Sequence, residues 1–146
     1  MTTRRALVQP LIASLVLCSL AAAAVPLPPG LYDVTVETTM PHLEESLRYA
    51  TTHEQRCLQG QELTAAFPVL NHASLKDCRL EREERTGDAV SYVLVCANGS
   101  GTTGNARWTL GEHRADGTLN VKLGGKNMTF SQRWTAVRLG NCATSS

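Results

Sequence analysis

Two cysteines in a pair of alternating segments constrain this chain more than any other feature. The segment that begins at Cys78 and the segment that ends at Cys96 flank a turn centred on Gly87. A hairpin that closes symmetrically about this glycine places the two cysteines directly opposite each other. Facing residues in an antiparallel pair are close enough to form a disulfide. The sequence therefore predicts an antiparallel hairpin with a Cys78–Cys96 bond.

The same register separates the two faces of the hairpin. It predicts three further facing pairs, namely Leu80 with Leu94, Arg82 with Tyr92, and Glu84 with Val90. The opposite face is charged (Arg79, Glu81, Glu83 and Arg85). A slip of one residue would turn the two leucines away from the core and separate the cysteines.

The remaining cysteines point to a second bond. The chain has five cysteines, and Cys18 lies in an N-terminal segment that we expect to be removed. Four cysteines in an exported chain are typical of a disulfide framework. With Cys78 and Cys96 paired, Cys57 and Cys142 are left to pair with each other. A zinc site is the alternative, but the cysteines are widely spaced and form no C-x-x-C motif, so no metal is expected.

The first 24 residues follow the three-part plan of a signal peptide. Two arginines give a positive start, an apolar stretch runs from Ala6 to Leu20, and Ala21–Ala24 end the segment. These small residues suit cleavage before Val25. A membrane anchor is the alternative, but the apolar stretch is shorter than the roughly 20 residues of a spanning helix.

We therefore expect residues 1–24 to be cleaved and residues 25–146 to form one disulfide-stapled β domain, periplasmic or secreted. A lipoprotein anchored at Cys18 is disfavoured because Leu17 stands where a small residue is needed. A twin-arginine signal at Arg4-Arg5 fits a cofactor-free disulfide protein less well than the general secretory route. Lys and Arg number 14 and Asp and Glu 13, so neither nucleic acid nor an acidic membrane surface is an expected partner.

Alternating apolar residues predict about seven strands. The first spans 31–40, and a more polar second strand spans 47–57, after a turn at 41–46. The one helical pattern, Gln61–Phe67, is short and stops at Pro68. We expect an antiparallel meander curled into a barrel-like sheet, with this helix between the second and third strands. A two-sheet sandwich is the alternative.

The last three strands can be registered from their turns. A turn at Asp116-Gly117 predicts Leu110 opposite Leu123 and Glu112 opposite Val121. A turn at Gly125-Lys126 predicts Leu123 opposite Met128 and Val121 opposite Phe130. The residues that share the resulting apolar face are either core or the lining of a ligand cavity (Trp108, Leu110, Leu119, Val121, Leu123, Met128, Phe130 and Trp134).

Several motifs suggest chemistry without supporting it. Residues 99–104 match G-x-G-x-x-G, but an alternating strand follows where a nucleotide-binding loop needs a helix. The histidines (His42, His53, His72 and His113) share no metal-ligand spacing, and Ser91 and Ser131 have no partner that the sequence can name. We therefore assign no catalytic, cofactor-binding or metal-binding residue.

The order of the four cysteines and their surroundings resembles the bacterial exported family of domains of unknown function numbered 3617. The matching segments are Gly30-Leu-Tyr32, Cys57-Leu58, Asp77-Cys78, Thr86-Gly87, Val90-Ser-Tyr92, Cys96 and Arg138-Leu-Gly-Asn-Cys142. The resemblance covers essentially the whole mature chain. It implies a Gram-negative periplasmic setting, and it implies no catalytic residue, because no activity is established for the family.

Two classes of function remain. The first is a non-catalytic binding or interaction module whose apolar face or end loop holds a small apolar ligand or another envelope protein. A related version inhibits a secreted hydrolase through a rigid loop held by a disulfide. The second is a cofactor-free hydrolase, which would need scattered His, Glu and Ser residues to converge in one pocket.

Overall fold

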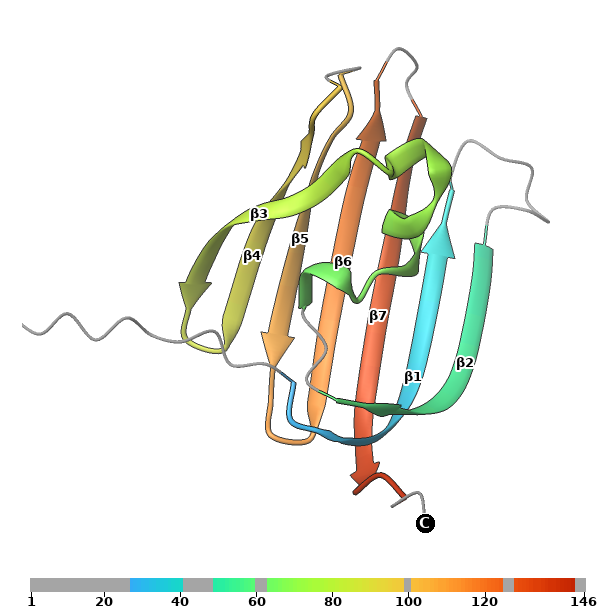
Figure 1. Ribbon diagram of the computed structural model, residues 1–146, viewed down its shortest axis with the longest axis vertical. Coiled ribbons are helices and arrows are strands. Elements are labelled where there is room, and N and C mark those ends of the chain that lie inside the picture. Colours follow the sequence, from blue (N-terminus) through green and yellow to red (C-terminus); the bar gives the residue numbers. More distant parts are fainter. Residues whose placement is uncertain (1–26, 41–48, 60–62, 99–100, 125–127, 144–146) are drawn as a thin grey trace, which may run out of the picture.

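The chain forms one antiparallel sheet. The computed structural model describes residues 27–40, 49–59, 63–98, 101–124 and 128–143. The strands are β1 (Gly30–Thr39), β2 (Tyr49–Leu58), β3 (Cys78–Thr86), β4 (Ala89–Cys96), β5 (Thr103–Leu110), β6 (Arg114–Leu123) and β7 (Met128–Gly140). Their order across the sheet is β2-β1-β7-β6-β5-β4-β3 (Figure 1). The prediction of a mostly β protein with seven antiparallel strands is confirmed.

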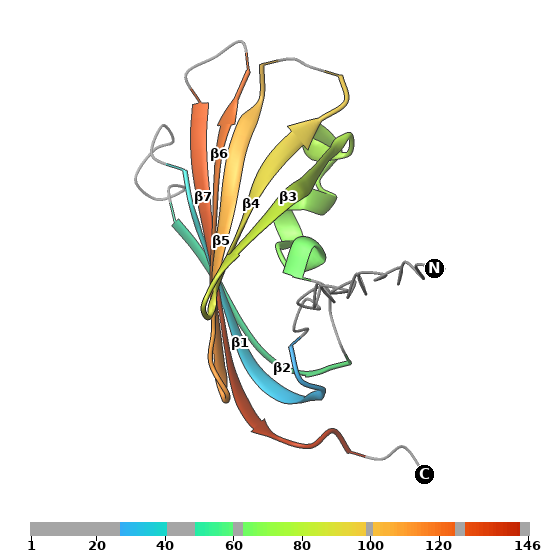
Figure 2. The same ribbon diagram turned by 90° about the vertical axis from the view of Figure 1, so that its left-hand side faces the viewer.

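The predicted barrel-like closure is wrong. Strands β2 and β3 are the two edges of an open, twisted sheet (Figure 2). Only β3 to β7 form a meander, because β1 lies between β2 and β7. The chain that leads into β3 crosses one side of the sheet and buries Phe67 and Leu75 there. The apolar side is therefore covered by a loop instead of by its own edge strand.

The predicted helix at Gln61–Phe67 is also wrong. The described residues between β2 and β3 contain only short 3-10 turns: η2 (Leu63–Ala65), η3 (Pro68–Asn71) and η4 (Ala73–Leu75). Residues 60–62 lie outside the described part. Pro68 has no N–H and disfavours a helical residue before it, and Phe67 is extended, so η2 and η3 cannot join into one helix. We call residues 63–75 the cover, the side of the sheet that carries it the inner face, and the opposite side the outer face.

The inner face is the core of the protein. One row crosses it through successive facing partners on β4, β5, β6, β7 and β1, which are Val90, Trp108, Gly117, Trp134 and Val36. Four of these five are apolar side chains that are almost completely buried. The two tryptophans thus lie near the middle of the sheet.

The predicted register of the β3–β4 hairpin is confirmed near the two cysteines and wrong near the turn. Cys78 faces Cys96 and Leu80 faces Leu94, as predicted. A bulge between Glu81 and Glu84 then shifts the register, so Glu84 faces Ser91 and Arg85 faces Val90. Arg82 sits in this bulge with a φ of 56°. The extra residue explains why the predicted Arg82–Tyr92 and Glu84–Val90 pairs do not form.

The β5–β6 register also differs from the prediction. The turn lies at residues 111–113, so Leu110 faces Ala115 and Gly117 faces Trp108 inside the strands. The predicted pairs of Leu110 with Leu123 and of Glu112 with Val121 are therefore wrong. The predicted β6–β7 register is confirmed, with Leu123 opposite Met128 and Val121 opposite Phe130.

Both predicted disulfides are present. The Cys78–Cys96 bond joins edge strand β3 to β4. The Cys57–Cys142 bond joins edge strand β2 to the segment that follows β7. It passes the first residues of β1, because Leu31 pairs with Cys57 on one side and with Gly140 on the other. Each edge strand is therefore held by a covalent bond.

The expected signal peptide at residues 1–24 and the turn at 41–46 lie outside the described residues. Within the described residues, no helix is long and apolar enough to cross a membrane.

Candidate functional site

The first candidate site is the aromatic centre of the inner face. The rings of Trp108 and Trp134 meet edge to face with centroids 5.2 Å apart. Phe67 belongs to the cover, and the centroid of its ring lies 4.9 Å from that of Trp108. All three side chains have no measurable exposure. The cover therefore closes over the two tryptophans through one aromatic contact.

The residues predicted to face a ligand or the core lie together on the inner face. Trp108, Val121, Phe130 and Trp134 are buried, whereas Leu110, Leu123 and Met128 are partly exposed. The hollows described below include neither tryptophan in their lining. With the cover in place, both tryptophan side chains are fully buried.

The two indole N–H groups are the unusual feature of this core. The Nε1 atoms of Trp108 and Trp134 are both buried, and neither has a hydrogen-bond partner in the described part of the chain. A buried donor without an acceptor costs roughly 1 to 3 kcal/mol. Buried tryptophans usually find an acceptor for this group. The core therefore holds two donors that an acceptor atom would satisfy.

Few polar contacts hold the cover to the sheet. The backbone N–H of Val69 donates to Oε1 of Gln132 at 3.4 Å, and Nε2 of Gln132 donates to the Thr38 hydroxyl at 2.9 Å. The other backbone hydrogen bonds of the cover close its own turns, such as Leu75 N–H to His72 O at 2.8 Å. The cover is held mainly by apolar contacts and by the Cys78–Cys96 bond that follows it.

The outer face offers a second, polar candidate site. A hollow of about 320 Å³ lies over β2, β1, β7 and β6. Its lining includes Glu37 and Arg133, which face each other across β1 and β7. A second hollow of about 360 Å³ lies over β5, β6 and β7, and the two share Ser131. Hydroxyl and charged groups line both hollows, and the second also has the amides of Asn105 and Asn120.

An ion pair lies on β6 of the same face. The Arg114 guanidinium donates to both carboxylate oxygens of Asp116 at 2.6 and 2.7 Å. The Thr135 hydroxyl donates to Oδ1 of Asp116 at 3.1 Å. The hydrogen bonds from Arg114 are the largest cause that lowers the pKa of Asp116, and partial burial opposes them. Asp116 therefore stays ionised at neutral pH.

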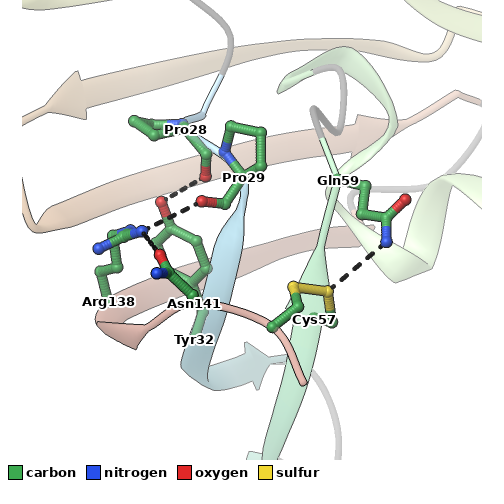
Figure 3. Close-up of a disulfide and its surroundings, with 8 residues drawn as sticks. Pro28, Pro29, Tyr32, Cys57, Gln59, Arg138 and Asn141 are labelled. Atoms are coloured by element: carbon green, nitrogen blue, oxygen red, sulfur yellow. Dashed lines mark hydrogen bonds between the residues drawn. A yellow bond between two sulfur atoms is a disulfide. The ribbon is translucent and has the colours of Figure 1, made fainter. Parts of the chain in front are cut away.

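A third hollow lies beside the Cys57–Cys142 disulfide. It has a volume of about 430 Å³ and is lined by Pro29, Gly30, Gln59, Asn141 and Cys142. The adjoining Arg138 guanidinium donates to Pro29 O at 3.3 Å and to Oδ1 of Asn141 at 2.9 Å (Figure 3).

Tyr32 anchors the same corner. Its hydroxyl donates to Pro28 O at 2.8 Å (Figure 3). Burial raises the pKa of the Tyr32 phenol, and the charge of Arg138 partly offsets this effect. The Tyr32 bond holds the segment before β1, and the Arg138–Pro29 bond ties that segment to the end of β7, which suits a structural role.

The comparisons with known proteins identify a family. A profile described as a protein of unknown function, DUF3617, matches residues 27–142. The chain belongs to the DUF3617 family. A comparison with curated proteins found no match, and a comparison with solved structures found none either. In this DUF3617 chain, any account of function must therefore rest on its own residues.

The motifs that suggested chemistry are dispersed in the DUF3617 fold. Gly101 precedes β5, Gly104 lies within β5 and no helix follows, while residues 99–100 lie outside the described part. His53 is exposed on β2, His72 in the cover and His113 in the β5–β6 turn, and His42 is not described. In the described ranges, no three His, Cys, Asp or Glu residues are grouped so that they could hold a metal ion.

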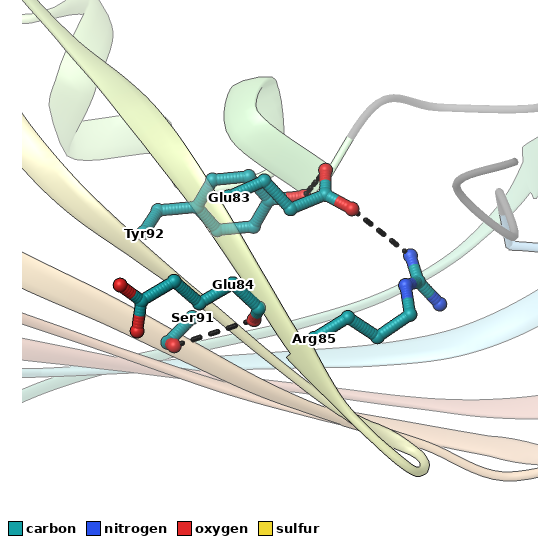
Figure 4. Close-up of polar contacts among 5 residues, drawn as sticks. All are labelled: Glu83, Glu84, Arg85, Ser91 and Tyr92. Atoms are coloured by element: carbon teal, nitrogen blue, oxygen red, sulfur yellow. Dashed lines mark hydrogen bonds and ion pairs between the residues drawn. The ribbon is translucent and has the colours of Figure 1, made fainter. Parts of the chain in front are cut away.

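The acidic cluster on β3 of this DUF3617 chain has a structural explanation. Oε2 of Glu83 accepts from the Tyr92 hydroxyl at 2.8 Å, and Oε1 accepts from Arg85 at 3.2 Å (Figure 4). The Ser91 hydroxyl donates to Glu84 O at 3.4 Å. The bulge at Arg82 thus places Glu83 within reach of Tyr92 on β4, and this hydrogen bond ties edge strand β3 to its neighbour.

Proposed function

We propose that this chain is a non-catalytic binding module that holds a small amphiphile between the cover and the inner face. The ligand would have an apolar body and one oxygen that accepts hydrogen bonds. The observation that carries the proposal is the pair of buried indole N–H groups of Trp108 and Trp134, which lack acceptors. Ligand sites are mostly apolar with a few polar groups that fix orientation, and an apolar face with two free donors fits this description.

The cover supports the proposal because few polar bonds tie it to the sheet. Among the described residues, one hydrogen bond, from Val69 to Gln132, joins its backbone to a side chain of the sheet. Its turns are closed by their own backbone bonds, so they can remain intact as the cover moves. An acyl chain that displaces Phe67 would replace one apolar contact with another. The acceptor oxygen would then satisfy the donors, which the closed state leaves unpaired.

The cysteines support an exported location. Two disulfides are typical of proteins in oxidising compartments. With the expected signal peptide at residues 1–24, they favour the periplasm or the outside of the cell. A carrier of small amphiphiles suits that setting, since acyl chains cross the aqueous space between membranes only when they are shielded from water.

Tryptophan fluorescence tests the proposal directly, because the chain contains two tryptophans and both lie in the proposed site. The oxidised protein is titrated with 10-bromodecanoate, whose bromine quenches nearby indoles, and separately with 1-bromodecane, which has no acceptor oxygen. We expect saturable quenching by the acid and at least roughly tenfold weaker quenching by the alkyl bromide, since an indole-to-carboxylate bond contributes about 1.5 to 3 kcal/mol. Equal quenching by both compounds would contradict the role of the indole donors.

Two variants separate the donors from the fold. Trp134→Phe removes one donor and keeps an aromatic ring, so binding measured through Trp108 should weaken. Gln132→Leu removes the polar attachment of Val69, so the cover should open more often and association should be faster. The matched control is Tyr49→Phe, which removes an exposed hydroxyl far from the core. If the wild-type protein shows no quenching at any ligand concentration below the solubility limit, the proposal is wrong.

A further inference from the structure

A cation and an anion lie side by side on the outer face without forming an ion pair. Glu37 on β1 and Arg133 on β7 are directly facing partners, and both line the hollow of about 320 Å³. Among the described residues, neither side chain makes an ion pair within 4.0 Å. The guanidinium keeps its donors, the carboxylate keeps its acceptors, and both remain available to a ligand.

Hydroxyl groups surround this charged pair. Thr51 faces Glu37 from β2, and Thr118 faces Arg133 from β6. Both threonines line the hollow, as does Ser131. Each hydroxyl can donate one hydrogen bond and accept others. The hollow therefore presents donors and acceptors in close alternation, and its net charge is neutral.

An aromatic ring stands at the rim of the same hollow. Tyr49, at the start of β2, faces Thr39 and lines the hollow. It is 64 % exposed, the largest exposure among the large hydrophobic residues that the structure describes. An exposed ring offers an apolar surface with a polar tip. It can cover a flat, weakly apolar part of a ligand.

We infer that this outer-face hollow binds a neutral saccharide through a vicinal diol. One sugar hydroxyl donates to the Glu37 carboxylate and its neighbour accepts from the Arg133 guanidinium. A hydroxyl is donor and acceptor at once, so adjacent hydroxyls match a carboxylate beside a guanidinium better than a single charge does. Tyr49 packs against the C–H face of the sugar ring, and the threonine and serine hydroxyls bind its other oxygens.

The size and shape of the outer face favour a short chain of sugars. A volume of about 320 Å³ lies at the lower end of the range for small-molecule pockets, roughly 300 to 1,000 Å³. The second hollow of about 360 Å³ continues from Ser131 and adds Asn105, Asn120 and Lys122. Asn105 and Asn120 are facing partners on β5 and β6, and their amides can bind further sugar oxygens. An oligosaccharide can therefore occupy both hollows.

Amide chemical shifts provide the test. The oxidised protein is labelled with ¹⁵N and titrated with chitotetraose and with maltotetraose, up to about 10 mM, where dissociation constants near 1 mM are measurable. We expect saturable shifts with at least one of these sugars, confined to residues in and beside the two hollows on β1, β2, β5, β6 and β7. If neither sugar shifts these amides at the highest concentration, the inference is wrong.

Two variants and a matched control identify the binding groups. Glu37→Gln and Arg133→Met should each weaken binding by roughly tenfold or more, because each removes a hydrogen bond to a charged group. The control is Arg107→Met. Arg107 is an exposed arginine in the same row of the outer face, opposite Thr118, and it lines neither hollow. Equal weakening by Arg107→Met and Arg133→Met would show nonspecific attraction and overturn the inference.

The two sites can be tested independently. Both tryptophans lie on the inner face, so sugar binding should leave the fluorescence titration with 10-bromodecanoate unchanged. A sugar that shifts the amides of the cover and changes the tryptophan fluorescence would place its site on the inner face and overturn the assignment.

Discussion

The ring of Trp108 lies directly over the backbone of Gly117 on the neighbouring strand. A Cβ added to Gly117 would come within 2.5 Å of Cζ3 of Trp108 and within 2.6 Å of Cε3. The two residues are facing partners on β5 and β6. Glycine is therefore required here by an aromatic contact and not by a turn. Rings that cover a facing glycine are a known way to stabilise a strand that contains one.

This contact predicts that Gly117→Ala is destabilising. The methyl group meets three atoms of a fully buried ring, so the tryptophan must move, which should lower the free energy of unfolding by about 1 to 3 kcal/mol. Urea unfolding followed by circular dichroism measures the change. Gly140→Ala is the matched control because nothing lies within 4 Å of its added Cβ. Similar losses in both variants would argue against the contact as the cause.

The two disulfides should contribute unequally. The Cys57–Cys142 bond closes a sequence separation of 85 residues and the Cys78–Cys96 bond one of 18. The chain-entropy estimate is about 4 to 5 kcal/mol for the first and about 3 kcal/mol for the second. The double serine variant of the first pair should therefore lower the unfolding midpoint more than that of the second. Urea titrations of both variants provide the comparison, and the reverse order would refute the estimate.

The bulge on β3 leads to a prediction of opposite sign. Arg82 has a φ of 56°, the only positive φ among the non-glycine residues that the structure describes. An L-residue in this region pays a steric cost that glycine avoids. Arg82→Gly should therefore leave stability unchanged or raise it by up to about 1 kcal/mol, as measured by thermal unfolding.

Arg79→Gly supplies the contrast on the same strand. Arg79 is exposed and extended, so glycine there should destabilise the strand. Equal destabilisation by the two variants would show that the bulge is not maintained in solution.

The Asp116 carboxylate predicts a pH dependence. Its pKa is lowered in the folded state, mainly by hydrogen bonds from Arg114, so it stabilises the fold above the unfolded pKa of about 3.9. This contribution is lost as the pH falls through the folded pKa. Since the side chain is 42 % exposed, the effect should stay below about 1 kcal/mol.

The measurement is the stability difference between wild type and Asp116→Asn as a function of pH. The difference should be largest near neutral pH and should disappear in acid. Glu112→Gln is the control, because its side chain is 89 % exposed. A difference that stays constant down to pH values well below the ordinary aspartate pKa of about 3.9 would contradict the role of ionisation.

Pairing between neighbouring strands could be predicted from the sequence where the alternation of apolar and polar residues and a short turn determine the register. The facing of Cys78 with Cys96 and of Val121 with Phe130 follows from short turns between alternating segments, and both pairs are present. The errors come from residues whose role depends on tertiary structure. Gly117 resembled a turn residue but packs under a tryptophan. Arg82 gave no signal of a bulge, since arginine has no preference for a positive φ.

Long-range strand pairing could not be predicted, and the one long-range contact that was predicted, Cys57 with Cys142, came from pairing the remaining cysteines. Glu37 and Arg133 face each other only because β1 pairs with β7, and no turn connects these strands. The prediction of a closed sheet also failed on a long-range feature. The cover, and not β2, occupies the space beside the inner face. The tryptophans were recognised as apolar-face residues, but their unpaired N–H groups depend on three-dimensional packing. A pattern of polarity along one strand carries no information about such partners.

The position of β1 also sets an order of events during folding. β1 pairs with β7 from Thr39 opposite Ser131 to Leu31 opposite Gly140, so one of its two neighbours is the last strand to be synthesised. Pairing between distant segments is slow because a long loop must close first. Strands β3 to β7 can assemble through local hairpins, whereas the β1–β2 hairpin alone has little stability. If β3 to β7 pair first through their hairpins, the edge of β7 stays unpaired until β1 docks on it, and an unpaired edge is prone to aggregation.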